Sequence, residues 1–372
     1  MREASDTQTS GPAPGRRVLI VGGVAGGASC AARLRRLDET AEIVVFDRGP
    51  YVAFANCGLP YFVGDVTVTL LEKLPQVMPP LDPEMAEPLM EHLRAKGVAL
   101  HLGDGLSRID DAGEGRLRVI AESGAALDAD LVILALGVKP ETSLAKSAGL
   151  TIGARGGIVV DNQMRTSDPH IWAVGDVVET PDVLLGQITV LPLAGPANRQ
   201  GRVAAESIAG RPTQFRGIQA TAVVGVLGMT VASTGASEKG LRRAGVTNFE
   251  RVYLHPGHHA GYYPGARPIH LKLVFSVPDG RILGAQAIGQ EGTEKRIDVI
   301  ATAIQFGGTV HDLAESELCY APQFGAAKDP VNLAGMLAQN VLNGDMPLAD
   351  WSELEHADAL LVDVREPDEY AR

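Results

Sequence analysis

One cysteine lies in the stretch of the chain that most suggests chemistry, FANCGLPYF at residues 54–62. Cys57 stands between a small polar residue and a glycine, and the other two cysteines, Cys30 and Cys319, are far from it in the sequence. A thiolate is a nucleophile and an electron relay, and a position near a helix start favours it over the thiol. By itself, the stretch fits either a redox centre or a small buried hydrophobic residue.

A glycine-rich turn precedes this cysteine and runs from Gly22 to Gly27, with Val24 where the G-x-G-x-x-G pattern has its middle glycine. The turn follows a short apolar run and opens a helical pattern, so its backbone N–H groups and helix dipole could hold a pyrophosphate. Asp47 comes 20 residues after Gly27, where an acid would accept hydrogen bonds from a ribose. These residues predict a dinucleotide site, with a purely structural turn as the alternative.

A second acidic position, Asp176, ends the segment TSDPHIWAVGD. We predict that this segment is a strand, which would place the carboxylate at the carboxyl edge of a sheet, where α/β folds bind ligands. The alternative is an aspartate that only caps a helix.

The elements that position these residues alternate between strand and helix up to about residue 216. Strands are predicted near residues 16–23, 41–49, 66–73, 98–104 and 129–137, and helices over 24–39, 79–97 and 196–210. The run ADLVILALG, at 129–137, is typical of a strand buried in a parallel sheet. From about Gly217 the pattern changes to antiparallel strands followed by helices at 294–307 and 329–342, which predicts an appended α+β domain.

The composition limits the function classes. The 372 residues carry a formal net charge of −12, which argues against nucleic acid or an anionic membrane surface as a partner. Three scattered cysteines fit a reducing cytoplasm, and no apolar run reaches the length of a membrane helix. We expect residues 1–17, which are polar and rich in proline and glycine, to be a disordered leader without a signal peptide.

Taken together, these segments resemble the FAD-dependent pyridine nucleotide–disulfide oxidoreductases, in particular the coenzyme A disulfide reductase branch with its rhodanese-fused forms. The resemblance extends from Val18 to Leu342. It implies a homodimer, with an FAD/NAD(P)-binding region at 18–216, a dimerisation domain at 217–345 and the truncated start of a rhodanese-like domain at 350–372. The motifs that carry the resemblance are GGVAGGASCAARLRRLD, FANCGLPYFVG, LPQVMPPLDPEM, TSDPHIWAVGD, LPLAGPANRQGR, HHAGYYPGA and YAPQFGAAKDPVNLAG.

The resemblance assigns the cofactor residues. FAD would be held by Gly22 and Gly27 at the pyrophosphate, by Asp47 at the adenosine ribose and by Asp176 at the ribityl chain. NAD(P)H would be the reductant.

The resemblance also makes Cys57 the redox centre. Many relatives carry a second cysteine five residues later, where this chain has Phe62, so a single-cysteine enzyme is implied. Its oxidised form would be a sulfenate or a mixed disulfide with a small thiol. The peroxidase and oxidase branches usually have a histidine where Ala25 stands, which favours the mixed disulfide with coenzyme A.

Further residues are assigned to the thiol substrate. Tyr262 and Tyr320, from the partner subunit, would protonate or orient the leaving thiolate, with Tyr263 as a substitute for Tyr262. Arg36 and Asn56 would contact coenzyme A. Ordinary interface packing of the tyrosines and a solvated Arg36 are the alternatives. We predict no metal site, because the loop histidines His255, His258 and His259 lack companions at ligand spacing.

The resemblance has a gap. After Gly64-Asp65 the chain continues directly into VTVTLLEK, which in relatives follows a second glycine-rich turn for the nicotinamide cofactor. The strand–helix–strand unit that would carry this turn needs about 30 residues, and the sequence has no such stretch between Asp65 and VTVTLLEK. Neighbouring strands would lose ladder partners and expose apolar faces. The chain is then either an internally deleted version of a working reductase or a protein that holds FAD weakly and uses NAD(P)H poorly.

The sequence therefore predicts a cytoplasmic enzyme that reduces coenzyme A disulfide, or a related persulfide or polysulfide, with NAD(P)H through FAD and Cys57. Two alternatives remain: an NADH oxidase or peroxidase that uses a Cys57 sulfenate, and a flavin-binding remnant without turnover. We predict no sulfurtransferase activity, because the catalytic loop of a rhodanese domain does not follow residues 350–372.

Overall fold

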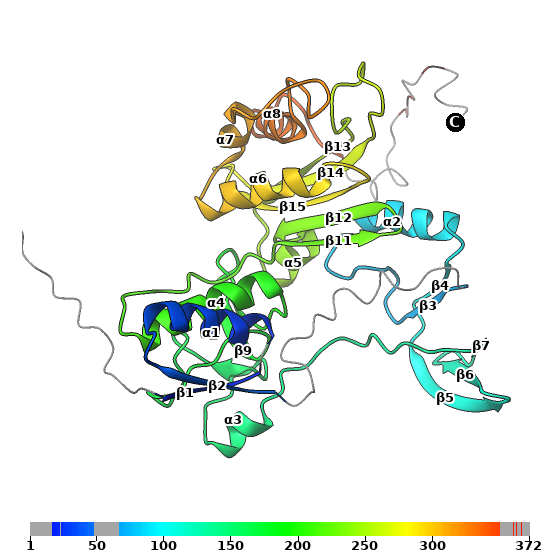
Figure 1. Cartoon of the computed structure of the whole chain (residues 1–372). Helices are drawn as coiled ribbons and strands as arrows, with labels where there is room; N and C mark the ends of the chain where they lie inside the picture. The colour runs from blue at the N-terminus through cyan, green and yellow to red at the C-terminus, as the bar shows by residue number, and fades with distance from the viewer. Residues whose placement is uncertain are drawn as a thin grey trace, which may run out of the picture.

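The structure is a computed structural model, and it describes residues 17–22, 24–47, 67–349, 360, 362 and 366. Figure 1 shows two main bodies, one around helices α1 and α4 and the other around a large sheet that carries α6 to α8. The helices are α1 Ala25–Leu37, α2 Pro83–Ala95, α3 Ser143–Ser147, α4 Ala194–Ile208, α5 Glu238–Arg243, α6 Thr293–Gln305, α7 Val310–Glu315 and α8 Pro330–Leu342.

The strands form five separate sheets in the described part of the chain. Those of the first half are β1 Arg17–Val21, β2 Glu42–Phe46, β3 Thr69–Glu72, β4 Ala99–Leu102, β5 Leu106–Gly113, β6 Arg116–Ala121, β7 Ala126–Ala129, β8 Ile158–Val159, β9 Val178–Pro181 and β10 Ile188–Thr189. Those of the second half are β11 Ala222–Val226, β12 Met229–Gly235, β13 Phe249–Leu254, β14 Ile269–Ser276 and β15 Ile282–Gly289.

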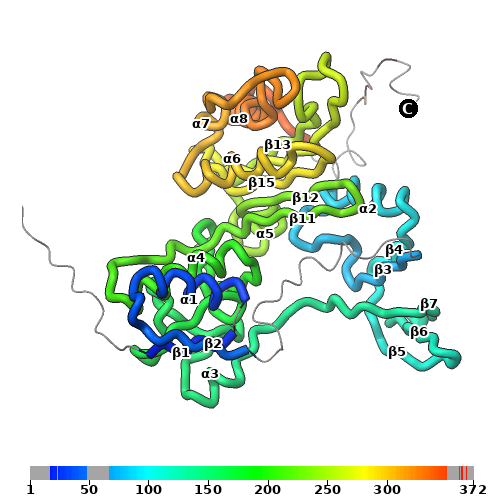
Figure 2. Tube along the Cα trace, in the orientation of Figure 1, coloured from blue at the N-terminus to red at the C-terminus, as the bar shows by residue number. Residues whose placement is uncertain are grey.

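The first half contains two parallel strand pairs, each joined through a helix. β1 pairs with β2 across α1, and β3 pairs with β4 across α2. Both are strand–helix–strand units of the kind predicted, and β5, β6 and β7 follow as an antiparallel meander. Helices α1 and α4 lie side by side over one face of the β1–β2 pair, as both views show (Figures 1 and 2).

The second half is built on one antiparallel sheet in the order β11-β12-β15-β14-β13. Side chains alternate between its two faces, as the period of a strand requires. On β14, Leu271 and Leu273 face α6, α7 and α8, where they join the largest apolar cluster. On the opposite face, Val231 of β12 and Ile288 of β15 pack against the apolar side of α2. The sheet therefore has a helical layer on each face, and one of those layers comes from the first half of the chain.

Two predicted strands are absent from the structure. Residues 130–140 have no regular secondary structure and leave large apolar side chains in solvent, so the buried strand predicted at 129–137 is wrong. The segment ending at Asp176 is also irregular and makes one isolated bridge, between Arg165 and Trp172. The exposed side chains of the first segment are Leu131, Ile133, Leu134, Leu136 and Val138.

These two differences have a physical reason. A strand of a parallel sheet is stable only with ladder partners, because its backbone N–H and C=O groups must be paired when it is buried. Among the described residues, β3 pairs only with β4, and β1 pairs only with β2. Leu19 and Val21 of β1 also face solvent. The apolar run at 129–137 has the composition of a strand but pairs with no other strand in the described part of the chain.

No helix among the described residues has the length and apolar character needed to cross a membrane.

Leu136 tests whether the segment at 129–137 is exposed in solution as it is in the structure. Leu136 is 76% exposed. We expect Leu136→Asp to change the free energy of unfolding by no more than about 0.5 kcal/mol, because it loses no burial. Leu273→Ala, in the fully buried core, should cost about 2–5 kcal/mol in the same urea titration. A loss of several kcal/mol for Leu136→Asp would show that the segment is buried in solution.

Candidate functional site

The glycine turn has a geometry that only glycine allows at its two ends. Gly22 has φ +95°, and its N–H donates to the carbonyl of Phe46 at the end of β2 (2.7 Å). A Cβ at Gly27 would lie 1.9 Å from the carbonyl oxygen of Gly22. The turn is thus closed so tightly that any side chain at position 27 would collide with backbone, which agrees with the role predicted for both glycines.

Small residues also bring α1 against α4. A Cβ at Gly201 of α4 would lie 2.3 Å from the carbonyl oxygen of Gly26, so the two helix backbones are in direct contact. Farther along, Arg33 and Glu206 form a part-buried ion pair between the helices (2.6 Å). This packing fixes the direction in which the first turn of α1 points.

The same contact places the predicted Asp176 beside the glycine turn. Val174 fills the space next to Gly26, and the Gly175 N–H donates to Oε1 of Gln200 in α4 (2.7 Å). The side chain of Asp176 is accessible to solvent, although partial burial raises its pKa above the ordinary value. Val174, two residues before Asp176, therefore meets the start of α1 from some 150 positions away in the chain, and the cofactor-binding role of Asp176 stays a prediction.

The start of α1 fits a pyrophosphate. Its N-cap residue, Val24, offers no side-chain cap, and the first turn contains no acidic residue. Asp47 comes immediately after the last residue of β2. A helix N-terminus with uncapped N–H groups, a backbone that leaves room for phosphate and an acid at the end of the second strand match what the diphosphate and ribose of FAD require.

The two tyrosines predicted to act on the thiol lie together. Oη of Tyr262 and Oη of Tyr320 are 2.9 Å apart, although 58 positions separate the residues in the sequence. Both are exposed, at 77% and 48%, and they belong to the loops that follow β13 and α7. The hydrogen bond between the two hydroxyls raises the pKa of the Tyr320 hydroxyl above its ordinary value.

Of the predicted redox cysteine and the residues predicted to contact the thiol substrate, only Arg36 lies in the described part of the chain. Arg36 is exposed on α1, and Cys57 and Asn56 lie outside the described residues. Cys30 is buried, and burial raises the pKa of its thiol to about 11, which makes it an inert core residue as expected. Cys319 is exposed next to Tyr320.

An acid ends the strand that would meet the ribose of a nicotinamide cofactor, and residues 48–66, shortly before that strand, lie outside the described part of the chain. Glu72 ends β3, and its Oε1 accepts from the N–H of Leu74 (2.9 Å). The strand and helix that would place a second glycine turn next to β3 are not found in the described range 67–176, where the only strand–helix–strand unit is β3–α2–β4.

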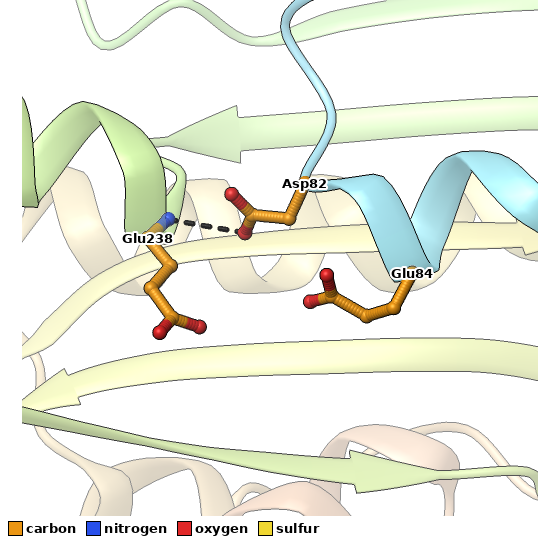
Figure 3. A group of neighbouring side chains, drawn as sticks. All are labelled: Asp82, Glu84 and Glu238. Carbon is orange, nitrogen blue, oxygen red and sulfur yellow. Dashed lines mark hydrogen bonds between the residues drawn. The ribbon is translucent and has the colours of Figure 1, made fainter. Parts of the chain in front are cut away.

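A buried charged cluster was missed by the sequence analysis. Nζ of Lys272 on β14 lies 2.8 Å from Asp82, 2.5 Å from Glu84 and 2.9 Å from Glu238, and Lys272 is fully buried. Figure 3 shows the three carboxylates converging from the start of α2 and the start of α5, where Oδ2 of Asp82 also accepts from the N–H of Glu238. The motif LPQVMPPLDPEM contains two of these acids. Nothing in the sequence, however, pairs them with a lysine 188 or 190 positions away.

The cluster is an ion-pair network. Three carboxylates at this spacing could hold a divalent cation, but the ammonium of Lys272 occupies the position between them. Burial opposes ionisation of Asp82 and Glu238, yet Lys272 and the neighbouring donors keep the pKa of both carboxyl groups below the ordinary value. The network fastens α2 to the sheet of the second half.

Comparison with known proteins places the chain among flavin-dependent and nicotinamide-dependent oxidoreductases. The family model described as pyridine nucleotide-disulphide oxidoreductase matches residues 63–201, and the model of that family's dimerisation domain matches residues 221–330. The crystal structure of reduced Bacillus anthracis CoADR-RHD superposes with a TM-score of 0.91 and 35% identity, over 96% of this chain and 87% of that one.

The curated relatives agree. The coenzyme A disulfide reductase of Staphylococcus epidermidis is 25% identical over 444 residues, which cover 87% of this chain and 100% of the relative. The NADH oxidase of Methanocaldococcus jannaschii is 36% identical over 273 residues, but the match spans only 59% of that protein's length and 72% of this chain. The chain belongs to the pyridine nucleotide–disulfide oxidoreductase family and, within it, to the branch that contains the coenzyme A disulfide reductases. Members of this family use FAD, with NAD(P)H as the reductant.

The alignment with the Staphylococcus epidermidis protein also has a length difference. It spans 444 positions, whereas 87% of the 372 residues of this chain is about 324, so about 120 positions have no counterpart here.

Gly27 tests the dinucleotide turn. We expect Gly27→Ala to abolish flavin binding, because its Cβ would collide with the Gly22 carbonyl. The measurement is the visible flavin absorbance per mole of protein after saturation with FAD and gel filtration. The matched control is Gly195→Ala in α4, where an added Cβ meets no atom within 4 Å and should change nothing. Equal flavin content in the two variants would contradict the assignment.

Lys272 tests the buried network. Lys272→Met leaves Asp82 without its counter-ion, whereas Glu238 keeps Arg242 and Arg251, and it should lower the free energy of unfolding by about 3–5 kcal/mol at pH 7. Lys73→Met removes an exposed, solvent-screened pair with Glu122 and should leave the midpoint of the unfolding transition almost unchanged.

The effect of Lys272→Met on the free energy of unfolding should depend on pH in a definite direction. The two buried carboxyls have lowered pKa values in the folded state, so their contribution is present above the unfolded values near 4 and is lost as the pH falls below them. The difference between wild type and Lys272→Met should therefore shrink below about pH 4. A difference that is constant between pH 7 and pH 3 would contradict this account.

Proposed function

We propose that this protein is a disulfide reductase of the coenzyme A disulfide reductase type, which works as a homodimer and uses Cys57 as its single redox cysteine. The electrons would pass from NAD(P)H by way of FAD to a disulfide or persulfide of a small thiol. The observation that carries the proposal is the hydrogen-bonded pair of Tyr262 and Tyr320.

The tyrosine pair suits the thiol half of this reaction. A tyrosine hydroxyl is protonated at neutral pH and can give a hydrogen bond or its proton to a leaving thiolate. In Tyr320 the raised pKa follows from the hydrogen bond with Tyr262, and both hydroxyls are accessible to a substrate or to a second subunit. Ordinary interface packing, the alternative for these tyrosines, would also leave them exposed in a single subunit, so the kinetic effect of Tyr262→Phe and Tyr320→Phe distinguishes the two.

The chemical steps balance with one thiol nucleophile. The Cys57 thiolate attacks one sulfur of the substrate disulfide, so that a new S–S bond forms to Cys57, the substrate S–S bond breaks and one thiolate leaves. Tyr320 gives its proton to the departing sulfur, and Tyr262 holds the hydroxyl in place. Two electrons are then needed to release the second thiol from Cys57, and supplying them is the chemistry that bound FAD contributes.

The structure also supports a second reading of this chain. Among the described residues β3 pairs only with β4, the apolar segment at 131–138 is exposed, and about 120 positions of a relative have no counterpart. A protein with these features would hold FAD at the start of α1 yet accept electrons from NAD(P)H slowly. The alternative function is therefore a flavin-binding protein with little turnover.

Cys57→Ser separates these possibilities. For the proposed reductase, we expect NADPH-dependent or NADH-dependent release of thiol from coenzyme A disulfide to fall at least 100-fold in this variant, while the flavin content stays unchanged. Thiol release is measured with a chromogenic thiol reagent under anaerobic conditions. The matched controls are Cys319→Ser and Cys30→Ser, which should keep the wild-type rate.

The outcomes are distinct. Full activity in a folded, yellow Cys57→Ser protein would overturn the proposed nucleophile. A wild-type protein whose flavin is not bleached by NADPH or NADH would establish the flavin-binding alternative. Activity with hydrogen peroxide in place of the disulfide would assign the chain to the oxidase or peroxidase reaction.

A further inference from the structure

We propose that Arg296 is a positioning residue for the tyrosine pair: its buried guanidinium, locked to Asp329, joins the two loops that carry Tyr262 and Tyr320. This inference deepens the proposed function and rests on it for the role of the tyrosines. The joining of the two loops is a separate claim that can be tested without turnover.

The side chain of Arg296 is almost completely buried, with Arg296 at 1% exposure, and its guanidinium donates hydrogen bonds to three other residues. Nε and Nη2 bind the two carboxylate oxygens of Asp329 at 3.2 and 2.8 Å, which is a bidentate pair. Nη2 also donates to the carbonyl of His258 (2.7 Å), and Nη1 donates to that of Gly292 (3.1 Å). One side chain on α6 therefore contacts two other segments at once.

Those two segments are the ends of the tyrosine loops. His258 comes four residues before Tyr262, and Asp329 comes nine residues after Tyr320 at the N-cap of α8. Between them, the N–H of Ala260 donates to the carbonyl of Gly325 (2.8 Å), so the loops are also joined directly by backbone. The tyrosines lie beyond this junction and have no contact of their own with Arg296 among the described residues.

Asp329 is held as firmly as Arg296. Its carboxylate also accepts from the N–H of Val331, and the Asp329 N–H donates to Oδ1 of Asn332, which completes a capping box. The Asn332 amide in turn donates to the carbonyls of Leu313 and Ser316, which lead into the Tyr320 loop. The Tyr320 loop is thus fixed at both of its ends, and Arg296 is the connection from there to the Tyr262 loop.

A lysine could not replace this arrangement. The planar guanidinium presents donors in fixed directions to a carboxylate and to two carbonyls, whereas an ammonium offers a point charge at the end of a shorter reach. We therefore expect Arg296→Lys to keep the buried charge paired with Asp329 and to lose the bond to the His258 carbonyl. Loss of that bond would release the Tyr262 loop without removing either tyrosine.

The experiment follows the tyrosine pair by fluorine NMR of the full chain labelled with 3-fluorotyrosine. The variants Tyr262→Phe and Tyr320→Phe assign the two resonances, and a pH titration of each resonance gives the midpoint of each hydroxyl. In wild type, we expect the Tyr320 midpoint to be raised and to fall when Tyr262 becomes phenylalanine. The Arg296→Lys protein should show the same fall in the Tyr320 midpoint while both tyrosines are still present.

A control distinguishes positioning from general destabilisation. Lys272→Met breaks a buried ion pair on the other face of the same sheet, so it should lower stability while the Tyr262 and Tyr320 resonances and midpoints stay as in wild type. If Arg296→Lys does not fold, Asp329→Asn replaces it, because the amide keeps the size of the carboxyl and the capping bonds while removing its charge. It should lower the Tyr320 midpoint in the same direction.

The results decide both claims separately. A wild-type Tyr320 midpoint in folded Arg296→Lys or Asp329→Asn protein would overturn the positioning role, as would an equal change in Lys272→Met. If the midpoint shifts as expected but Tyr262→Phe and Tyr320→Phe keep wild-type rates of thiol release, Arg296 still positions the pair and the proposed chemical role of the tyrosines fails.

Discussion

The buried ammonium of Lys272 is the constraint on which the arrangement of the two halves depends. A charge with no exposure needs counter-charges at hydrogen-bonding distance, and these come from α2 and α5 and not from the strand that carries the lysine. Because Asp82 stands at the start of α2, satisfying the lysine also presses the apolar side of that helix onto Val231 and Ile288. Electrostatic need and hydrophobic burial thus select the same position for the helix.

The two candidate functional groups rely on a different principle, the close approach of backbone. At the start of α1, glycines let a turn and a second helix come within contact distance, which leaves the N–H groups facing outward. At the tyrosine pair, two loops meet through a backbone hydrogen bond between Ala260 and Gly325 and through the carbonyl of His258. In both places the reactive or binding group is displayed by a rigid support that lies behind it.

Sequence patterns predicted the local helices and turns well, but they predicted poorly which strands form and pair in the sheets of the first half. The glycine turn, α1, α4 and the antiparallel second half follow from patterns of short range, and the meeting of Asp176 with the turn follows from the resemblance. The strand expected at 129–137 failed because composition alone cannot supply an edge to pair with. The Lys272 and Arg296 networks could not have been foreseen, since the charges involved are up to 190 positions apart and no local pattern couples them.

The packing of α2 has a consequence for how the chain can be divided. The boundary read from the sequence falls near residue 217, yet one layer of the second half's sheet is provided by residues 83–95. A fragment that begins at 217 would expose a strip of valine, methionine and isoleucine side chains to water. It would also leave the buried Lys272 with one of its three acids, Glu238. The cooperative unit is therefore discontinuous in the sequence. Helix α2 is synthesised some 140 residues or more before the strands on which it packs, and neither can reach its native packing until both have been made.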